Sequence, residues 1–153
     1  MGTLPSQAFS VRPATAADGA EVWPLIEHTP GDCPPRREAF DPDFAAMVNN
    51  PSRGVFVAEA WGVIAGYLVV HRHATIRPDA PVAWVEQLIV IESLRRRGIA
   101  RLLVEAAEEW ARDKGCAHVA ITTRGAEDFC EALGYAATAA FHEKILLTER
   151  VLA

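Results

Sequence analysis

The sequence predicts an α+β fold, in which a run of strands is followed by a long helix and further short elements. Three observations support this class. Residues 82–90 (VAWVEQLIV) alternate as a strand does, and apolar residues then recur at helical spacing over residues 99–110. Two further apolar segments, residues 55–60 and 63–71, flank Trp61-Gly62 and predict an antiparallel hairpin.

The N-terminal third is expected to contain one strand and two helices. Phe9–Arg12 reads as a short first strand, and a helix is expected after Pro13. Pro24 should kink or shift that helix, because proline removes a backbone donor. Residues 36–48 are expected to form a second helix, interrupted at Asp41-Pro42.

The C-terminal half continues with alternating elements. The helix that starts near residue 99 should end at Lys114-Gly115, where a basic last turn meets a glycine stop. The elements expected after it are a strand at His118–Thr122, a short helix at Ala126–Leu133 and closing strands over Tyr135–Leu147.

Length and composition indicate one globular domain, which we expect to span residues 1–153. The longest apolar stretch, residues 63–70, is too short to span a bilayer. A net charge of −5 argues against general nucleic-acid binding and suits a cationic substrate better. The three cysteines form neither a disulfide framework nor a zinc motif, so we expect a cytoplasmic protein without a metal.

The turn between the strand at residues 82–90 and the following helix has the features of a phosphate-binding loop. Its sequence is Arg95-Arg96-Arg97-Gly98-Ile99-Ala100. Gly98 allows a ligand to approach the backbone, and the first amides of a helix lack intrahelical partners and carry partial positive charge. Three arginines alone are also typical of a solvated helix start, but the position between strand and helix favours an anionic pyrophosphate.

These residues resemble the GCN5-related N-acetyltransferases, the GNAT superfamily. The loop is similar to the family's acyl-CoA pattern of Arg or Gln, two residues, Gly, one residue, then Gly or Ala, and it follows Leu88-Ile89-Val90. Residues 126–135 (AEDFCEALGY) are similar to the family segment Ala-x-x-Phe-Tyr-x-x-Leu-Gly-Phe/Tyr. A dinucleotide-binding Rossmann unit is a competing explanation, which the upstream hairpin and the absence of a Gly-x-Gly-x-x-Gly turn oppose.

The resemblance implies a fold and a co-substrate. The GNAT fold has a central mixed, mostly antiparallel sheet that splays between two parallel strands and is flanked by about four helices. Acetyl-CoA would lie in the gap, and one of the backbone N–H groups of Leu88, Ile89 and Val90 would polarise the thioester carbonyl. Phe129 would line the gap, although core packing explains it equally well. The residues implied for pyrophosphate binding are Arg95, Arg96, Arg97, Gly98, Ile99 and Ala100.

Attack by an amine requires the loss of a proton, because a lysine-like amine with a pKa of about 10.4 is neutral only about once in 10³ molecules at pH 7. Glu86 is the candidate general base, since it shares strand parity with Leu88 and Val90 and many family members place a carboxylate there. A surface charge or an ion pair with an arginine is an equal alternative. His71 and His73 could serve as a base, line the acceptor pocket or simply mark an exposed strand end.

Cys130 departs from the family pattern. It stands where many GNAT enzymes carry the tyrosine that protonates the departing CoA thiolate. Cys130 is a candidate proton donor, because its reference pKa is close to that of the leaving thiol. The alternative, a packing role as a small hydrophobe on a helix face, is slightly favoured. Thr123 likewise stands where the family often has asparagine.

The resemblance therefore implies an acetyl-CoA-dependent N-acetyltransferase that acts on a primary amine of a small molecule or peptide by direct attack. The alternative is a non-catalytic acyl-CoA-binding or regulatory module that has lost the acid. No nucleic-acid or membrane partner is expected, whereas dimerisation is frequent in the family. The acceptor pocket would be built by residues 23–48 and 136–145, which hold no recognisable substrate motif; the loop at residues 30–35 is a natural lid.

Overall fold

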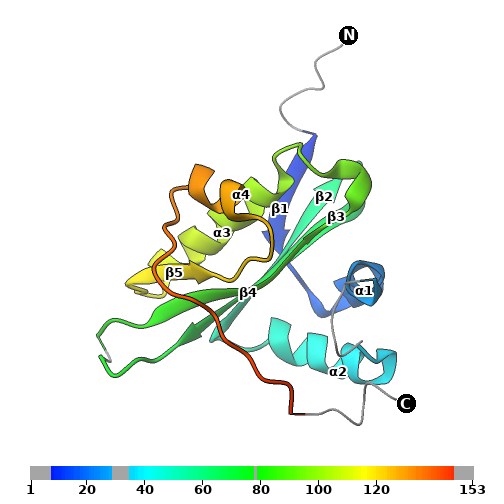
Figure 1. Ribbon diagram of the computed structural model, residues 1–153. Coiled ribbons are helices and arrows are strands. Elements are labelled where there is room, and N and C mark those ends of the chain that lie inside the picture. The colour runs from blue at the N-terminus through cyan, green and yellow to red at the C-terminus, as the bar shows by residue number, and fades with distance from the viewer. Residues whose placement is uncertain (1–7, 29–34, 78, 147–153) are drawn as a thin grey trace.

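The computed structural model describes residues 8–28, 35–77 and 79–146, which form a five-stranded sheet with the order β1-β2-β3-β4-β5 (Figure 1). The first four strands pair antiparallel, whereas β4 and β5 run parallel. This confirms the predicted mixed, mostly antiparallel sheet. The strands are β1 (Phe9–Pro13), β2 (Arg53–Ala60), β3 (Val63–His73), β4 (Val82–Val90) and β5 (His118–Ile121).

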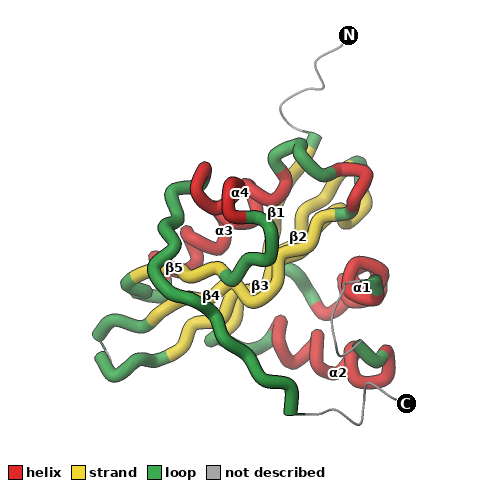
Figure 2. Tube along the Cα trace, viewed as in Figure 1, coloured by secondary structure: helices red, strands yellow, loops and turns green. Residues whose placement is uncertain are grey.

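Four α-helices in the described ranges cover the two faces of the sheet (Figures 1 and 2). Helices α1 (Gly19–Glu27) and α2 (Arg37–Val48) lie on one face, and α3 (Ile99–Asp113) and α4 (Glu127–Ala132) lie on the other. Short 3₁₀ turns, η1 (Ala16–Asp18) and η2 (Glu92–Leu94), precede α1 and α3. The sheet therefore has an apolar layer on each side.

Strand β3 separates these two apolar layers. Successive side chains of a strand point to opposite faces. Leu68 and Val70 accordingly pack in the cluster under α3, with Ile99 and Leu103, whereas Tyr67 packs in the cluster under α1 and α2. Burial on both faces explains why residues 64–70 read as an almost continuous apolar run.

The hairpin between β2 and β3 turns where the sequence predicts. Trp61 and Gly62 both have positive φ, 51° and 76°, as a two-residue type I′ turn requires. Trp61 accepts this conformation although it is not a glycine, and its ring meets Phe9 edge-on with centroids 5.8 Å apart.

Helix α2 is not broken at Asp41-Pro42, so that prediction is wrong. A proline inside a helix removes one donor and crowds the carbonyl four residues earlier, here that of Glu38. Tertiary packing outweighs this local cost, because Phe40 and Phe44 on either side of Pro42 are buried in the layer under the sheet. Helix α1 also continues through Pro24.

The predicted closing strands are absent from residues 135–146, and Leu147 lies outside the described residues. The segment leaves α4, crosses in front of β4 and runs toward α2 without pairing with a strand (Figures 1 and 2). Most of it is exposed, including Phe141 and Ile145. Apolar alternation predicts a strand only where the chain also pairs with an edge, and this segment pairs with neither the open edge of β5 nor that of β4.

Candidate active site

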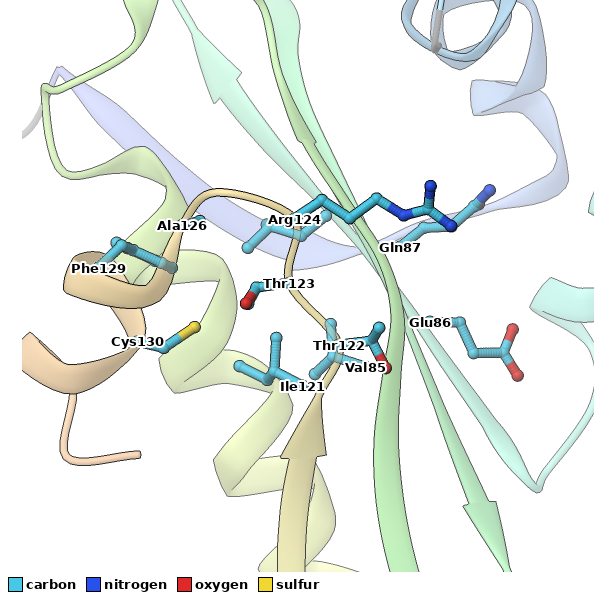
Figure 3. Close-up of a pocket in the computed structure, with 11 residues that line it drawn as sticks. Val85, Glu86, Gln87, Ile121, Thr122, Thr123, Arg124, Ala126, Phe129 and Cys130 are labelled. Carbon is cyan, nitrogen blue, oxygen red and sulfur yellow. The ribbon is translucent and has the colours of Figure 1, made fainter. Parts of the chain in front are cut away.

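The parallel strands β4 and β5 separate toward their carboxyl ends. Their last paired residues are Val85 and Ile121, so the Glu86–Val90 part of β4 has no strand on that side within the described chain. This is the splay that the fold prediction requires. A cavity of about 220 Å³ opens in the gap and is lined by Val85, Glu86, Gln87, Leu88, Ile121, Thr122, Thr123, Arg124, Ala126, Phe129 and Cys130 (Figure 3).

A β-bulge lies directly after the last pair. Val69 and Val70 of β3 face Gln87 and Val85 of β4, which leaves Glu86 as an inserted residue without an opposite partner. A bulge reverses the alternation of the strand beyond it and increases its twist. Odd-numbered residues before Glu86 and even-numbered residues after it therefore face the same side of the sheet.

Because of the bulge, Glu86 does not share the face of Leu88 and Val90, so the orientation predicted from the sequence is wrong. Leu88 and Val90 belong to the layer under α3, but Glu86 contacts Arg53 and His71 on the opposite face. The Arg53 Nη1 to Glu86 Oε2 distance is 2.9 Å, and His71 Nδ1 lies 3.4 Å from Oε1. The ion pair with an arginine, one of the two alternatives for Glu86, is therefore present.

The histidines of β3 lie as the alternation predicts. His71 reaches Glu86, and the His73 ring lies 5.7 Å from the His71 ring and 6.5 Å from Trp84. The side chain of His71 is 29% exposed. Both histidines thus lie on the face of the sheet that α1 and α2 cover.

The backbone of β4 presents alternate residues to the gap. Ile91 N–H donates to the Ala65 carbonyl on β3 at 2.9 Å, and the Ile89 carbonyl lies against Gly66 of β3. Because backbone groups alternate between the two edges of a strand, those of Leu88 and Val90 point to the gap. Of the three residues whose N–H groups are candidates to polarise the thioester carbonyl, Ile89 thus directs its backbone to β3 and not to the gap.

The loop after η2 has alternating backbone conformations. Arg96 and Gly98 have positive φ, 63° and 87°, while Arg95 has φ −66°. Such alternation directs successive N–H groups to one side and forms an anion-binding concavity. Arg95 Nε also donates to the Val90 carbonyl at 3.1 Å, which ties the loop to the end of β4.

The start of α3 is suited to an anion. Within the described residues, no backbone carbonyl accepts from the amides of Ile99, Ala100 and Arg101, and the first turn contains no acidic residue. A Cβ placed on Gly98 would meet nothing within 4 Å. The side chain of Ile99 is buried in the core, so this residue can contribute only its backbone. The predicted pyrophosphate site therefore has unpartnered donors, open space and a favourable dipole.

Cys130 and Phe129 lie on the α4 side of the cavity, away from Glu86 (Figure 3). Burial raises the pKa of the Cys130 thiol, and the nearby charge of Glu127 raises it further. The thiol is therefore kept protonated near neutral pH. Tyr135 is not available in its place, because its hydroxyl donates to Glu108 Oε1 on α3 at 2.9 Å.

Two polar residues of the cavity, Gln87 and Arg124, were not identified from the sequence. The Tyr67 hydroxyl donates a hydrogen bond to Gln87 Oε1. Arg124, in the loop after β5, pairs with Glu143 in the segment that follows α4. Both contacts join residues about twenty positions apart, so no local pattern indicates them.

Comparison with known proteins agrees with this geometry. A sequence profile of the acetyltransferase (GNAT) family matches residues 21–135, which include β4, the arginine loop and α4. The chain belongs to the acetyltransferase (GNAT) family. The predicted superfamily is confirmed. The loop and the β4 edge described above are the parts that fit acetyl-CoA as co-substrate.

Similar sequences include aminoglycoside N(6')-acetyltransferases. The type 1 enzyme of Salmonella typhimurium is 34% identical over 71 residues, which are 44% of this chain and 49% of the relative. The chain thus matches about half the length of that relative. The type 1 enzyme of Klebsiella aerogenes is 29% identical over 123 residues, covering 74% of this chain and 78% of the relative.

Similar folds occur among solved structures. An acetyltransferase of Trypanosoma brucei has 22% identity and a TM-score of 0.78, covering 90% of this chain and 99% of the other. Aminoglycoside N-acetyltransferase AAC(6')-Iy, in complex with CoA, has 24% identity and a TM-score of 0.78, covering 93% and 99%. At this identity the likeness shows the fold. None of the helices in the described ranges is long and apolar enough to cross a bilayer.

Proposed function

We propose that the protein transfers an acetyl group from acetyl-CoA to a primary amine of a small molecule by direct attack. The observation that carries this proposal is the gap between β4 and β5, which has a carboxylate on one side and a protonated thiol on the other. An N-acetyltransferase needs a group that accepts the proton of the amine, and a group that donates a proton to the leaving thiolate assists the reaction.

Acetyl-CoA supplies the activated acyl group when bound. The loop amides of Arg96 to Ala100 and the exposed guanidinium groups of this loop would hold its pyrophosphate. The backbone of Leu88 and Val90 would hold its pantetheine arm along the open edge of β4. A Leu88 or Val90 N–H would also polarise the thioester carbonyl, as in an oxyanion hole.

Glu86 accepts the proton of the amine in this proposal. Its contacts with Arg53 and His71 fix the carboxylate on the acceptor-facing side of the bulge. A water between the two groups could relay the proton, because general bases act directly or through one water. His71 borders solvent and gives the proton a route out of the site.

Cys130 donates a proton to the leaving thiolate in this proposal. A buried thiol with a raised pKa holds its proton at neutral pH, so the donor form is present, but burial also makes it a weaker acid than a thiol in water. The donor is useful rather than essential, since protonating a thiolate with a pKa near 8.5 at pH 7 is worth only about 2 kcal/mol. A cysteine in place of the usual tyrosine is therefore compatible with turnover.

Thiol release from acetyl-CoA tests the proposal. The amine panel should include aminoglycosides, because the relatives named above carry that activity in their names, together with polyamines, amino acids and peptides. Release above background with any small amine supports the proposal. Acetyl-CoA binding, seen as a thermal shift, without release by any amine would support the alternative of a binding or regulatory module.

A further inference from the structure

The mouth of the cavity carries two hydrogen-bond donors on the side away from Cys130. Gln87 extends from the bulge of β4, and Arg124 extends from the loop after β5 across β4 (Figure 3). Both line the same cavity, and neither has a role in the proposed function. Their donors lie on the face where Glu86 points, which is the acceptor-facing side.

The orientation of the Gln87 carboxamide is determined by Tyr67. Tyr67 is fully buried, and burial, followed by the charge of Glu86, raises the pKa of its hydroxyl, which therefore stays a neutral donor. This hydroxyl donates to Gln87 Oε1. The carboxamide oxygen is thus occupied, and its NH₂ group has no acceptor among the described residues.

Arg124 forms an ion pair with Glu143 that a ligand could replace. Its guanidinium pairs with the Glu143 carboxylate, and the two side chains are 77% and 51% exposed. Exposed pairs of this kind contribute little to stability. Glu143 also lies in the irregular segment after α4, so a ligand can take its place without disturbing a helix or strand. The group that Arg124 binds here is a carboxylate.

The described lining of this cavity has no unpaired acidic residue that could bind a second ammonium group of an acceptor. Glu86 is the one acidic residue in its described lining, and it is already paired with Arg53. Glu143 is paired with Arg124. An acceptor with several ammonium groups would therefore face arginines, whereas an acceptor with one amine and one oxyanion would match the groups present.

We propose that Arg124 and Gln87 form a subsite for an oxyanion, a carboxylate or a phosphate, carried by the acceptor near its amino group. This proposal rests on the proposed function and narrows its acceptor class from amines in general to zwitterionic amines. The guanidinium binds the oxyanion through charged hydrogen bonds, and the carboxamide of Gln87 adds one neutral hydrogen bond. Glu143 is displaced from Arg124 when the acceptor binds.

The test compares amines that differ only in the oxyanion. Tyrosine is paired with tyramine for the carboxylate, and O-phosphoethanolamine is paired with ethanolamine for the phosphate. Thiol release from acetyl-CoA gives kcat/KM for each amine with the wild type, Arg124→Ala and Arg112→Ala. Arg112 lies on the outer face of α3 with its side chain 74% exposed and serves as a matched loss of one arginine.

We expect the wild type to prefer the anionic member of at least one pair by about tenfold to a hundredfold, the range for a charged hydrogen bond. Arg124→Ala should reduce that ratio to the few-fold that one neutral hydrogen bond from Gln87 supplies, and Arg112→Ala should leave it unchanged. The pair that shows the preference identifies carboxylate or phosphate as the oxyanion.

Two results would overturn the subsite. One is a preference for the uncharged member of both pairs, or turnover of aminoglycosides alone, either of which leaves the proposed acetyl transfer intact. The other is a preference for the anionic member that survives undiminished in Arg124→Ala. Failure of every amine to release thiol would instead refute the proposed function itself, and the subsite with it.

Discussion

Replacement of Glu86 by glutamine separates a catalytic base from an ion-pair partner. Glutamine keeps the size of the side chain and an oxygen that can accept from Arg53, but it cannot take up a proton. The pair with Arg53 is 27% and 26% exposed, and such pairs contribute about 0.2–1 kcal/mol. The protein should therefore remain folded, while kcat/KM at pH 7 falls by about 10²- to 10⁴-fold.

The pH dependence gives the sharper readout. Without a base, only amine that is already neutral can attack, and for an amine with a pKa of about 10.4 this fraction rises about tenfold per pH unit. The rate of Glu86→Gln should therefore climb about a hundredfold between pH 7 and pH 9 and narrow the difference from the wild type by the same factor. The wild type should change little over the same range, because its base removes the proton at either pH.

Thiol release at saturating acetyl-CoA, with the amine concentration well below KM, measures this profile directly. Glu105→Gln is the matched control, because it removes an exposed carboxylate from α3 outside the cavity lining. Activity of Glu86→Gln within about threefold of the wild type at pH 7, or a profile parallel to the wild type, would refute Glu86 as the base. Glu86 would then be a structural partner of Arg53.

Three further changes have defined outcomes. Cys130→Ala should lower kcat by up to about thirtyfold, the equivalent of about 2 kcal/mol, with little change in the acetyl-CoA Kd measured by calorimetry. Gly98→Val places a β-branched residue at φ 87° in open space, so we expect strain of about 1–2 kcal/mol in the loop and a roughly tenfold higher Kd for acetyl-CoA. Asp18→Asn should lower the free energy of unfolding at pH 7 by about 2 kcal/mol, because hydrogen bonds from Arg12 lower the pKa of Asp18 from 3.8 to about 2. A lowered pKa stabilises the fold above the unfolded value, so urea titrations should show this contribution disappear from the wild type as pH falls from about 4 to about 2, and much less so in Asp18→Asn.

Local patterns were sufficient to predict much of this fold. Strand β4 begins and ends at the predicted residues, and the hairpin turns at Trp61-Gly62, because alternation and turn conformation are properties of neighbouring residues. The arginine loop was also predictable, since its pattern spans six consecutive residues and its glycine has the positive φ that the turn needs.

Features that depend on distant segments were not predictable. The bulge at Glu86 is a matter of register between β3 and β4, and sequence alternation alone assigned this side chain to the wrong face. Helix α2 continues through Pro42 because Phe40 and Phe44 pack against another layer. The contacts of Gln87 with Tyr67 and of Arg124 with Glu143 likewise need the folded chain to bring their partners together.

The bulge links the two halves of the candidate site. It follows Val85, the last residue of β4 that pairs with β5, and a bulge bends its strand and increases its twist. Glu86 faces away from Val85, as regular alternation requires, and the inserted residue returns Leu88 and Val90 to the layer under α3 that Ala83 and Val85 also occupy. Had the strand been regular, Leu88 and Val90 would have shared the face of Glu86. The register shift therefore allows one strand to present a carboxylate on one face and to bury Leu88 and Val90 on the other, next to the edge that β5 leaves open beyond Val85.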